Sequence, residues 1–169
     1  VLKERTGMDI ALSPKGAKGS ITLAIDTALH GAEHYRVAVS KKGLAITGAT
    51  PAAVFRGVMT LNQLLLADPH EAERGRIPAV KIDDAPRFAL RALMIDPARN
   101  FLPVKDVKRF IEVMAKYKYN ALQLHLTDDQ GWRIALKSYP QLASPKSYSA
   151  ADIREIVAYA AEHYIDVIP

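Results

Sequence analysis

The sequence contains no cysteine among its 169 residues. This absence excludes a disulfide scaffold, a thiol nucleophile and a cysteine-ligated zinc site, although it does not fix the compartment. The chain also lacks an apolar run of the roughly 20 residues that a helix needs to cross a bilayer. The longest candidate, residues 61–69, is short and interrupted by polar groups. No membrane span is therefore expected.

Charge of one sign is not concentrated anywhere in the chain. The net charge is +5, and a basic protein that binds nucleic acid normally carries its charge in an arm or patch. Here lysine and arginine are spread along the chain with acidic residues between them. This distribution is typical of a solvated surface, so no nucleic-acid partner is expected. The glycine-framed serine of α/β-hydrolases is also missing.

Residues 1–85 have the pattern of a small α+β domain, with an antiparallel sheet and one helix. Apolar and polar residues alternate in "SITLAID", "HYRVAVS" and "GLAITG", which is the period of half-buried strands, and the last two predict a hairpin. Helical spacing follows in "TPAAVFRGVMTLNQLLLAD", with Thr50 as N-cap and Pro51 at the first helical position. A further strand is expected at residues 77–83, and the polar stretch "DDAPRF" marks the boundary.

Residues 86–169 alternate strands and helices. "LRALMID", "ALQLHL" and "IDVIP" predict buried strands, separated by two amphipathic helices of about four turns, which implies parallel strands. Ser149 and Asp152 have the spacing of a capping box before the second helix. A doubly wound sheet and the first third of a (β/α)8 barrel both fit. No Gly-x-Gly-x-x-Gly follows the first strand, which weakens the case for a dinucleotide fold. Because three parallel strands cannot cover themselves, and residues 1–8 resemble the tail of a helix, we expect a fragment of a larger protein.

Polar residues gather directly after two of these strands. "DPARN" contains Arg99, and "HLTDDQGW" contains His125, Asp128, Asp129 and Trp132. Active sites of parallel α/β folds lie at the carboxyl ends of strands, and a buried charge there needs a partner. Pairing of Arg99 with Asp128 or with Asp96 would meet this need.

Each of these residues also has a structural interpretation. Arg99 could serve only as an ion-pair partner, and Asp128 and Asp129 could begin a loop or cap a helix. His125 is expected to be a hydrogen-bonded core residue, and Trp132 could be core or a platform for a sugar ring. Too few oxygen or histidine ligands are present at fixed spacing for a metal site. No metal or cofactor is therefore expected.

The stretch from Arg91 to Leu142 closely resembles the start of the catalytic barrel of family 20 glycoside hydrolases, the β-N-acetylhexosaminidases. The family pattern Arg-Gly-x-x-x-Asp-x-x-Arg-His-Phe corresponds to residues 91–101, and the string "HLTDDQGWR" is highly specific. Residues 31–65 resemble the small domain that precedes this barrel. Asn100 and Ala92 depart from the usual histidine and glycine, and the loop near residues 143–146 is short. The resemblance covers nearly the whole chain and favours the barrel.

The family resemblance implies a function. It implies hydrolysis of terminal non-reducing N-acetylglucosamine or N-acetylgalactosamine by substrate-assisted retention, without a cofactor. Arg99 would bind outer sugar hydroxyls, Asp128 would support the catalytic glutamate through a histidine, and His125, Asp129 and Trp132 would shape the pocket. The catalytic Asp-Glu pair belongs to a later strand, so the 169-residue chain is expected to need the remainder of the barrel as a partner and to be inactive alone. A periplasmic or extracellular location is favoured by the resemblance. The alternatives are a non-catalytic carbohydrate-binding domain and an interaction domain.

Overall fold

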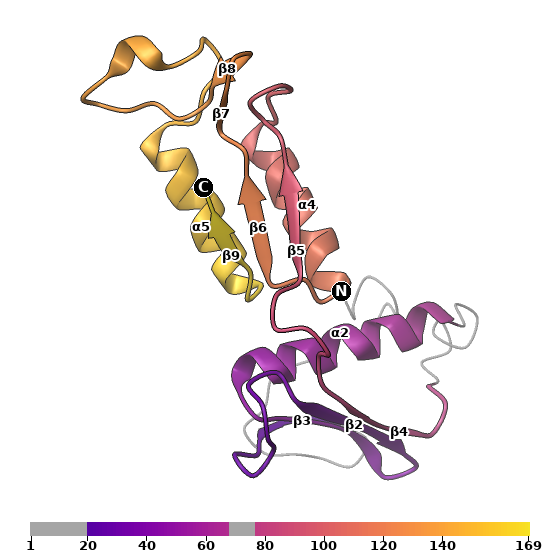
Figure 1. Ribbon diagram of the computed structural model, residues 1–169. Helices are drawn as coiled ribbons and strands as arrows, with labels where there is room; N and C mark the ends of the chain where they lie inside the picture. The colour runs from indigo at the N-terminus through magenta and orange to yellow at the C-terminus, as the bar shows by residue number, and fades with distance from the viewer. Residues whose placement is uncertain (1–19, 68–76) are drawn as a thin grey trace. The chain divides into compact units, whose positions relative to one another are not determined.

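The computed structural model describes residues 20–67 and 77–169, so the expected helix tail at residues 1–8 lies outside the described part. The chain is a mixed α/β protein with two compact units, Val1–Arg87 and Phe88–Pro169 (Figure 1). In the described ranges, no helix is long and apolar enough to cross a membrane.

The first unit contains a four-stranded sheet in the order β1-β3-β2-β4. Strands β2 and β3 form the predicted antiparallel hairpin, β2 and β4 are also antiparallel, and β1 lies parallel to β3. The alternation in β1 predicts that Leu23 and Ile25 are buried, but about half of each side chain is exposed. The strand bounds are β1 (Ile21–Ile25), β2 (Tyr35–Ser40), β3 (Gly43–Gly48) and β4 (Val80–Asp84).

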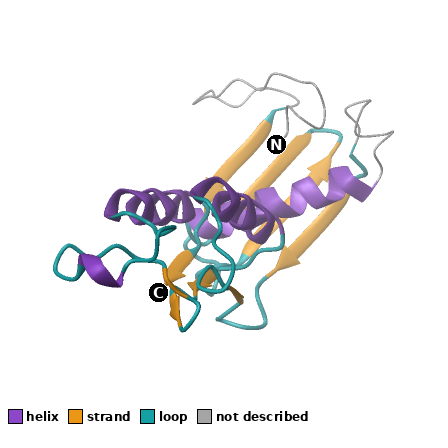
Figure 2. Cartoon of the chain, turned by 90° about the horizontal axis from the view of Figure 1, so that it is seen from above, coloured by secondary structure: helices purple, strands orange, loops and turns teal. Residues whose placement is uncertain are grey.

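Helix α2 (Pro51–Ala67) lies across one face of this sheet (Figures 1 and 2). The predicted N-cap is confirmed, because Thr50 Oγ1 accepts a hydrogen bond of 3.2 Å from the Ala53 amide. The helix and the strands share one apolar core. The fully or nearly fully buried members of this core are Tyr35, Val37, Leu44, Ile46, Ala53 and Leu61.

Gly57 permits the close approach of α2 to the sheet. A Cβ atom at this position would lie 2.5 Å from Ile46 Cγ2 and 3.3 Å from Tyr35 Cδ2. Alanine favours helix by about 1 kcal/mol over glycine, whereas overpacking a dense core costs about 1–3 kcal/mol. We expect Gly57→Ala to lower the free energy of unfolding by about 1 kcal/mol, measured by urea denaturation. Unchanged or increased stability would contradict this packing argument.

The second unit contains three parallel strands in the order β5-β6-β9, as the sequence predicts. Helix α4 follows β5, and helix α5 follows β6 and packs against α4. Lys108 Nζ pairs with Glu155 Oε1 at 2.5 Å, and the Tyr159 hydroxyl donates to Glu112 Oε1 at 2.8 Å. The bounds are β5 (Ala92–Ile95), α4 (Val104–Lys116), β6 (Ala121–Leu124), α5 (Ala150–Glu162) and β9 (Asp166–Ile168).

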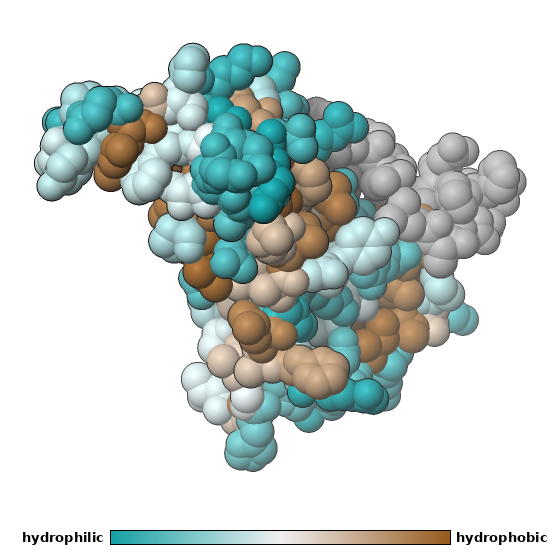
Figure 3. All heavy atoms as spheres, turned by 45° about the horizontal axis from the view of Figure 1, so that its top comes forward, coloured by the Kyte–Doolittle hydropathy of each residue, from teal (hydrophilic) through white to brown (hydrophobic). Residues whose placement is uncertain are grey.

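The two faces of this sheet differ in burial. Leu122 is fully buried together with Ile111 of α4 and Ile156 of α5. Successive side chains of a strand point to opposite faces, and the neighbours Met94, Gln123 and Ile168, which share one row of the sheet, are exposed. Figure 3 shows the side of the molecule that it presents, where hydrophobic residues (brown) lie among hydrophilic ones (teal). The helices therefore cover one face and leave the other open.

Local signals fix the ends of these elements. The predicted capping box is present, because the Asp152 amide donates to Ser149 Oγ and the Ser149 amide donates to Asp152 Oδ2. At the start of the strands, Asn120 Oδ1 accepts from the Arg91 amide at 2.8 Å, and Asn120 Nδ2 donates to the Ala89 carbonyl at 2.7 Å. The Asn120 carbonyl accepts from the Asp166 amide at 2.9 Å. Asn120 thus joins the amino ends of all three strands.

Candidate functional site

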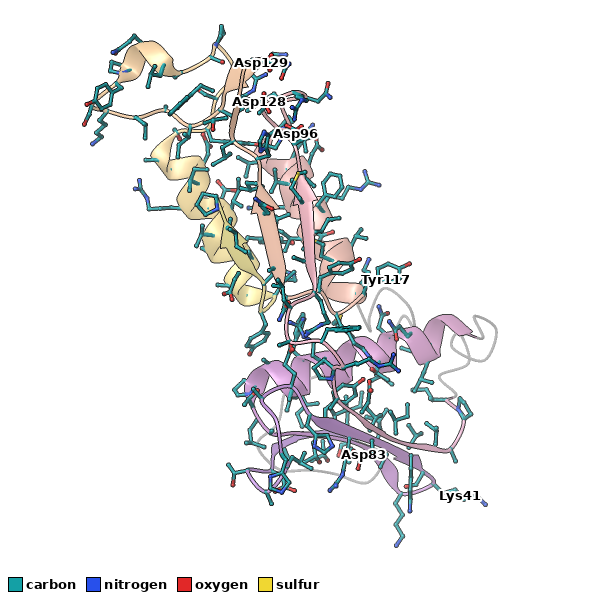
Figure 4. The ribbon with its side chains drawn as sticks, viewed as in Figure 1. Lys41, Asp83, Asp96, Tyr117, Asp128 and Asp129 are labelled. Atoms are coloured by element: carbon teal, nitrogen blue, oxygen red, sulfur yellow. The ribbon has the colours of Figure 1, made fainter. Side chains whose placement is uncertain are left out.

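Four side chains meet beyond the carboxyl ends of β5 and β6. The Arg99 guanidinium contacts two carboxylates, with Nη1 2.6 Å from Asp96 Oδ2 and Nη2 2.8 Å from Asp128 Oδ2. The same Asp128 oxygen lies 2.7 Å from His125 Nε2. Asp96, Asp128 and Asp129 appear close together at this end of the second unit in Figure 4.

A tight turn after β5 presents Arg99. The Asn100 amide donates to the Asp96 carbonyl, and the Arg99 amide donates to Asp96 Oδ1 at 3.1 Å. The Ala98 amide donates to the His125 carbonyl at 3.1 Å, which ties the turn to the end of β6. The register pairs Ile95 with Leu124, so the residues that follow these two strands lie at the same level.

A short hairpin after β6 presents Asp128. It consists of β7 (Thr127–Asp128) and β8 (Gly131–Trp132), paired antiparallel. The Asp129 amide donates to Asp128 Oδ1 at 2.8 Å, whereas the Asp129 residue itself is exposed. The two adjacent aspartates therefore differ in environment, and only Asp128 contacts both Arg99 and His125.

The hydrogen bonds at this site stabilise its charged forms. The hydrogen bond from His125, followed by those from Asp129 and the charge of Arg99, lowers the pKa of Asp128 to about 2. The hydrogen bonds from Arg99 hold the pKa of Asp96 below its ordinary value, and the bond to Asp96 raises the pKa of Arg99. Asp96, Asp128 and Arg99 are therefore charged across the physiological pH range.

Arg99 retains hydrogen-bonding capacity toward solvent. A guanidinium carries five N–H donors, and two of its nitrogens are engaged by the carboxylates. Half of its side chain is exposed, compared with 23% for Asp128. The network therefore orients a cation while leaving donors available to a ligand.

Trp132 anchors the hairpin to the loop that follows it. Its amide donates to Ser144 Oγ at 3.0 Å, and its carbonyl accepts from the Ser144 amide. The buried indole Nε1 has no hydrogen-bond partner among the described residues. The side chain is partly buried, so both interpretations of Trp132, core residue and sugar platform, remain compatible with its position.

The structure brings together several residues that the sequence singled out. Both predicted pairings of Arg99, with Asp96 and with Asp128, are confirmed. His125 is hydrogen-bonded as expected, but its expected place in the core is wrong, because 35% of its side chain is exposed. Arg133 was not predicted as a site residue, although its guanidinium contacts the backbone of the turn before Arg99. Its place at the end of "DDQGWR" was the available signal. Among the described residues, no group of three or more histidine or acidic side chains is suited to hold a metal ion.

Family models match both parts of the chain. The model described as glycosyl hydrolase family 20, domain 2, matches residues 1–85, and the model of the family 20 catalytic domain matches residues 88–169. The chain belongs to glycosyl hydrolase family 20.

Individual relatives agree with this assignment. The chain is 36% identical to a beta-hexosaminidase of Porphyromonas gingivalis and 36% identical to a beta-N-acetylhexosaminidase of Cellulomonas fimi, in each case over 96% of this chain. A solved structure of a mutant Streptomyces plicatus beta-hexosaminidase in complex with the product GlcNAc is similar with a TM-score of 0.89, at 38% identity over 99% of this chain. This chain spans 23%, 35% and 36% of the lengths of these three proteins.

Proposed function

We propose that this chain is part of a β-N-acetylhexosaminidase, which hydrolyses terminal non-reducing N-acetylhexosamine residues of glycans. The main observation behind this proposal is the half-exposed guanidinium of Arg99, which Asp96 and Asp128 hold at the carboxyl ends of adjacent parallel strands. A planar fork with free donors suits neighbouring sugar hydroxyls. Membership of family 20 and the relative solved with GlcNAc support this substrate class.

We also propose that residues 86–169 are the first β-α-β-α-β portion of a (β/α)8 barrel, and that residues 1–85 are a small α+β domain before it. Strands β5, β6 and β9 are parallel and follow one another in sequence order, and the helices between them pack against each other, as in a barrel whose crossovers all run in one direction. The row of Met94, Gln123 and Ile168 would then face the barrel interior. The two family-model matches meet near the same boundary.

In this proposal Arg99 binds the outer hydroxyls of the sugar, and Asp128 orients the residues around it. Asp129, His125 and Trp132 form the adjoining wall of the substrate site. Substrate-assisted retention requires the acetamido oxygen of the substrate to attack the anomeric carbon. The Asp-Glu pair that this mechanism uses would come from a later strand of the barrel, and no catalytic residue is assigned in this chain.

The test is hydrolysis by the full-length protein. It should release nitrophenol from 4-nitrophenyl N-acetyl-β-D-glucosaminide and not from 4-nitrophenyl β-D-glucoside, because only the first carries the acetamido nucleophile. The 169-residue chain alone should release none. If the full-length protein releases no nitrophenol at any pH but binds N-acetylglucosamine, the chain belongs to a carbohydrate-binding protein instead.

A further inference from the structure

Arg133 connects the turn that carries Arg99 to the loop that follows β8. Its Nε donates to the Pro97 carbonyl at 2.9 Å and its Nη2 to the Ala98 carbonyl at 2.8 Å, while Nη1 donates to the Lys146 carbonyl at 3.1 Å. The first two acceptors belong to the turn after β5, and the third belongs to the loop after β8. One planar group therefore joins two neighbouring carbonyls of the turn, those of Pro97 and Ala98, to a carbonyl nearly fifty residues later in the chain, that of Lys146.

The surroundings of Arg133 suit a planar group with several N–H donors. Pro97 and Ala98 are buried, so their carbonyls depend on a donor from the protein. The guanidinium carbon lies 5.9 Å from the centre of the Phe101 ring, and that ring packs against Tyr148 with 5.0 Å between ring centres. A lysine has a single nitrogen and lacks the fork that reaches separate acceptors.

Gly131 leaves the space that the guanidinium occupies. A Cβ atom at this position would lie 2.6 Å from Arg133 Cζ and 2.7 Å from Arg133 Nη2. A methyl group there would have to displace the guanidinium or the hairpin. The glycine of "DDQGWR" and the arginine two residues later thus form one arrangement.

The turn held by Arg133 is the turn that presents Arg99. Ala98 directly precedes Arg99, and the Ala98 carbonyl accepts from both Nε and Nη2 of Arg133. On the other side of the turn, Asp96 holds the Arg99 amide and guanidinium. We propose that Arg133 is a positioning residue, which sets the place of the Arg99 fork through the carbonyls of Pro97 and Ala98. This inference rests on the proposed sugar-binding role of Arg99.

The experiment is a double-mutant cycle in the full-length protein with 4-nitrophenyl N-acetyl-β-D-glucosaminide. Misplacement of a substrate-orienting group by about 1 Å costs on the order of 100-fold in rate. We expect Arg133→Lys to lower kcat/KM by about 100-fold in the wild-type background. In the Arg99→Ala background it should lower kcat/KM by less than about threefold, because residues that act as one unit are not additive. The exposed Arg154, on α5, provides the matched control Arg154→Lys, with no expected change.

The outcomes separate positioning from simple stabilisation. An equal loss of kcat/KM with and without Arg99→Ala would overturn the proposal, since a structural defect lowers activity whether or not Arg99 is present. No loss of kcat/KM in either background would overturn it as well. If Arg133→Lys does not fold, Gly131→Ala displaces the same guanidinium and enters the same cycle.

A second readout does not depend on activity. The NMR signal of the Arg99 Nε–H group should shift in Arg133→Lys and stay in place in Arg154→Lys. An unmoved Arg99 signal would contradict positioning even if the wild-type protein hydrolyses the substrate. A shifted signal in a protein without hydrolase activity would support positioning and refute the proposed function.

Discussion

Replacement of Arg99 by alanine in the full-length protein is expected to lower kcat/KM by about 10²- to 10³-fold with the fold intact. A site built to hydrogen-bond a hydroxyl loses about 10⁴- to 10⁵-fold when the bond cannot form, and the half-exposed position of Arg99 reduces this effect. The variant also leaves Asp96 and Asp128 facing the substrate without their shared cation. Steady-state kinetics with the nitrophenyl N-acetylglucosaminide measure the loss.

Two comparison variants make the Arg99 result specific. Arg99→Lys keeps the positive charge between the carboxylates but lacks the planar fork, so it should recover only part of the activity. Arg109→Ala removes an exposed arginine from the outer surface of α4 and should leave kinetics unchanged. Full recovery by lysine would show that charge alone is required and would remove the argument for a sugar clamp.

Replacement of Asp128 by asparagine is expected to lower kcat/KM by about 10- to 100-fold, the usual cost of losing a partner that orients a site residue. One Asp128 oxygen accepts from both His125 and Arg99. An amide has one oxygen and no charge, so it cannot retain both partners with equal strength. Asp129→Asn removes a neighbouring charge that does not contact His125, and it should have the smaller effect.

The acid dependence of stability gives an independent check on Asp128. Its pKa is about 2 in the folded protein and about 3.9 in an unfolded chain. The unfolded state therefore binds a proton first as the pH falls, and the stabilisation is present above about pH 4 and lost toward about pH 2. Thermal unfolding of the wild type should lose more stability across this window than that of Asp128→Asn. Parallel curves for the two proteins would contradict the depressed pKa.

Much of the fold is predictable because local patterns and tertiary packing agree. The alternation in residues 35–40 and 43–48 matches a hairpin, and the capping signals of Thr50 and Ser149 begin helices where expected. The failure at β1 has a physical cause. Alternation indicates which side chains share a face, but the burial of Leu23 and Ile25 depends on what lies over that face. Periodicity carries no information about this.

The sequence predicts the ion pairs of the site, but it does not predict the hairpin and the backbone contacts that hold them in place. Polar residues that follow two adjacent parallel strands lie close together. Because burying an unpaired charge is costly, the pairing of Arg99 with Asp96 and Asp128 could be predicted. The hairpin of β7 and β8 has only two residues in each strand, which is too short for a periodic signal. Arg133 was missed for a related reason, because its partners are carbonyls, which every residue carries.

The hydrogen bonds of Asn120 have a consequence for how such a protein tolerates change. They fix the alignment of β5, β6 and β9 at the amino ends of the strands, at the opposite end of the sheet from Arg99. Lengthening a surface loop costs little free energy, about 0.6 kcal/mol for each doubling. The outer part of the loop between Ala135 and Ser144 can therefore accept insertions without shifting the strands beneath it. The length and sequence of this loop can therefore change while the ion-pair network of Arg99 stays in place.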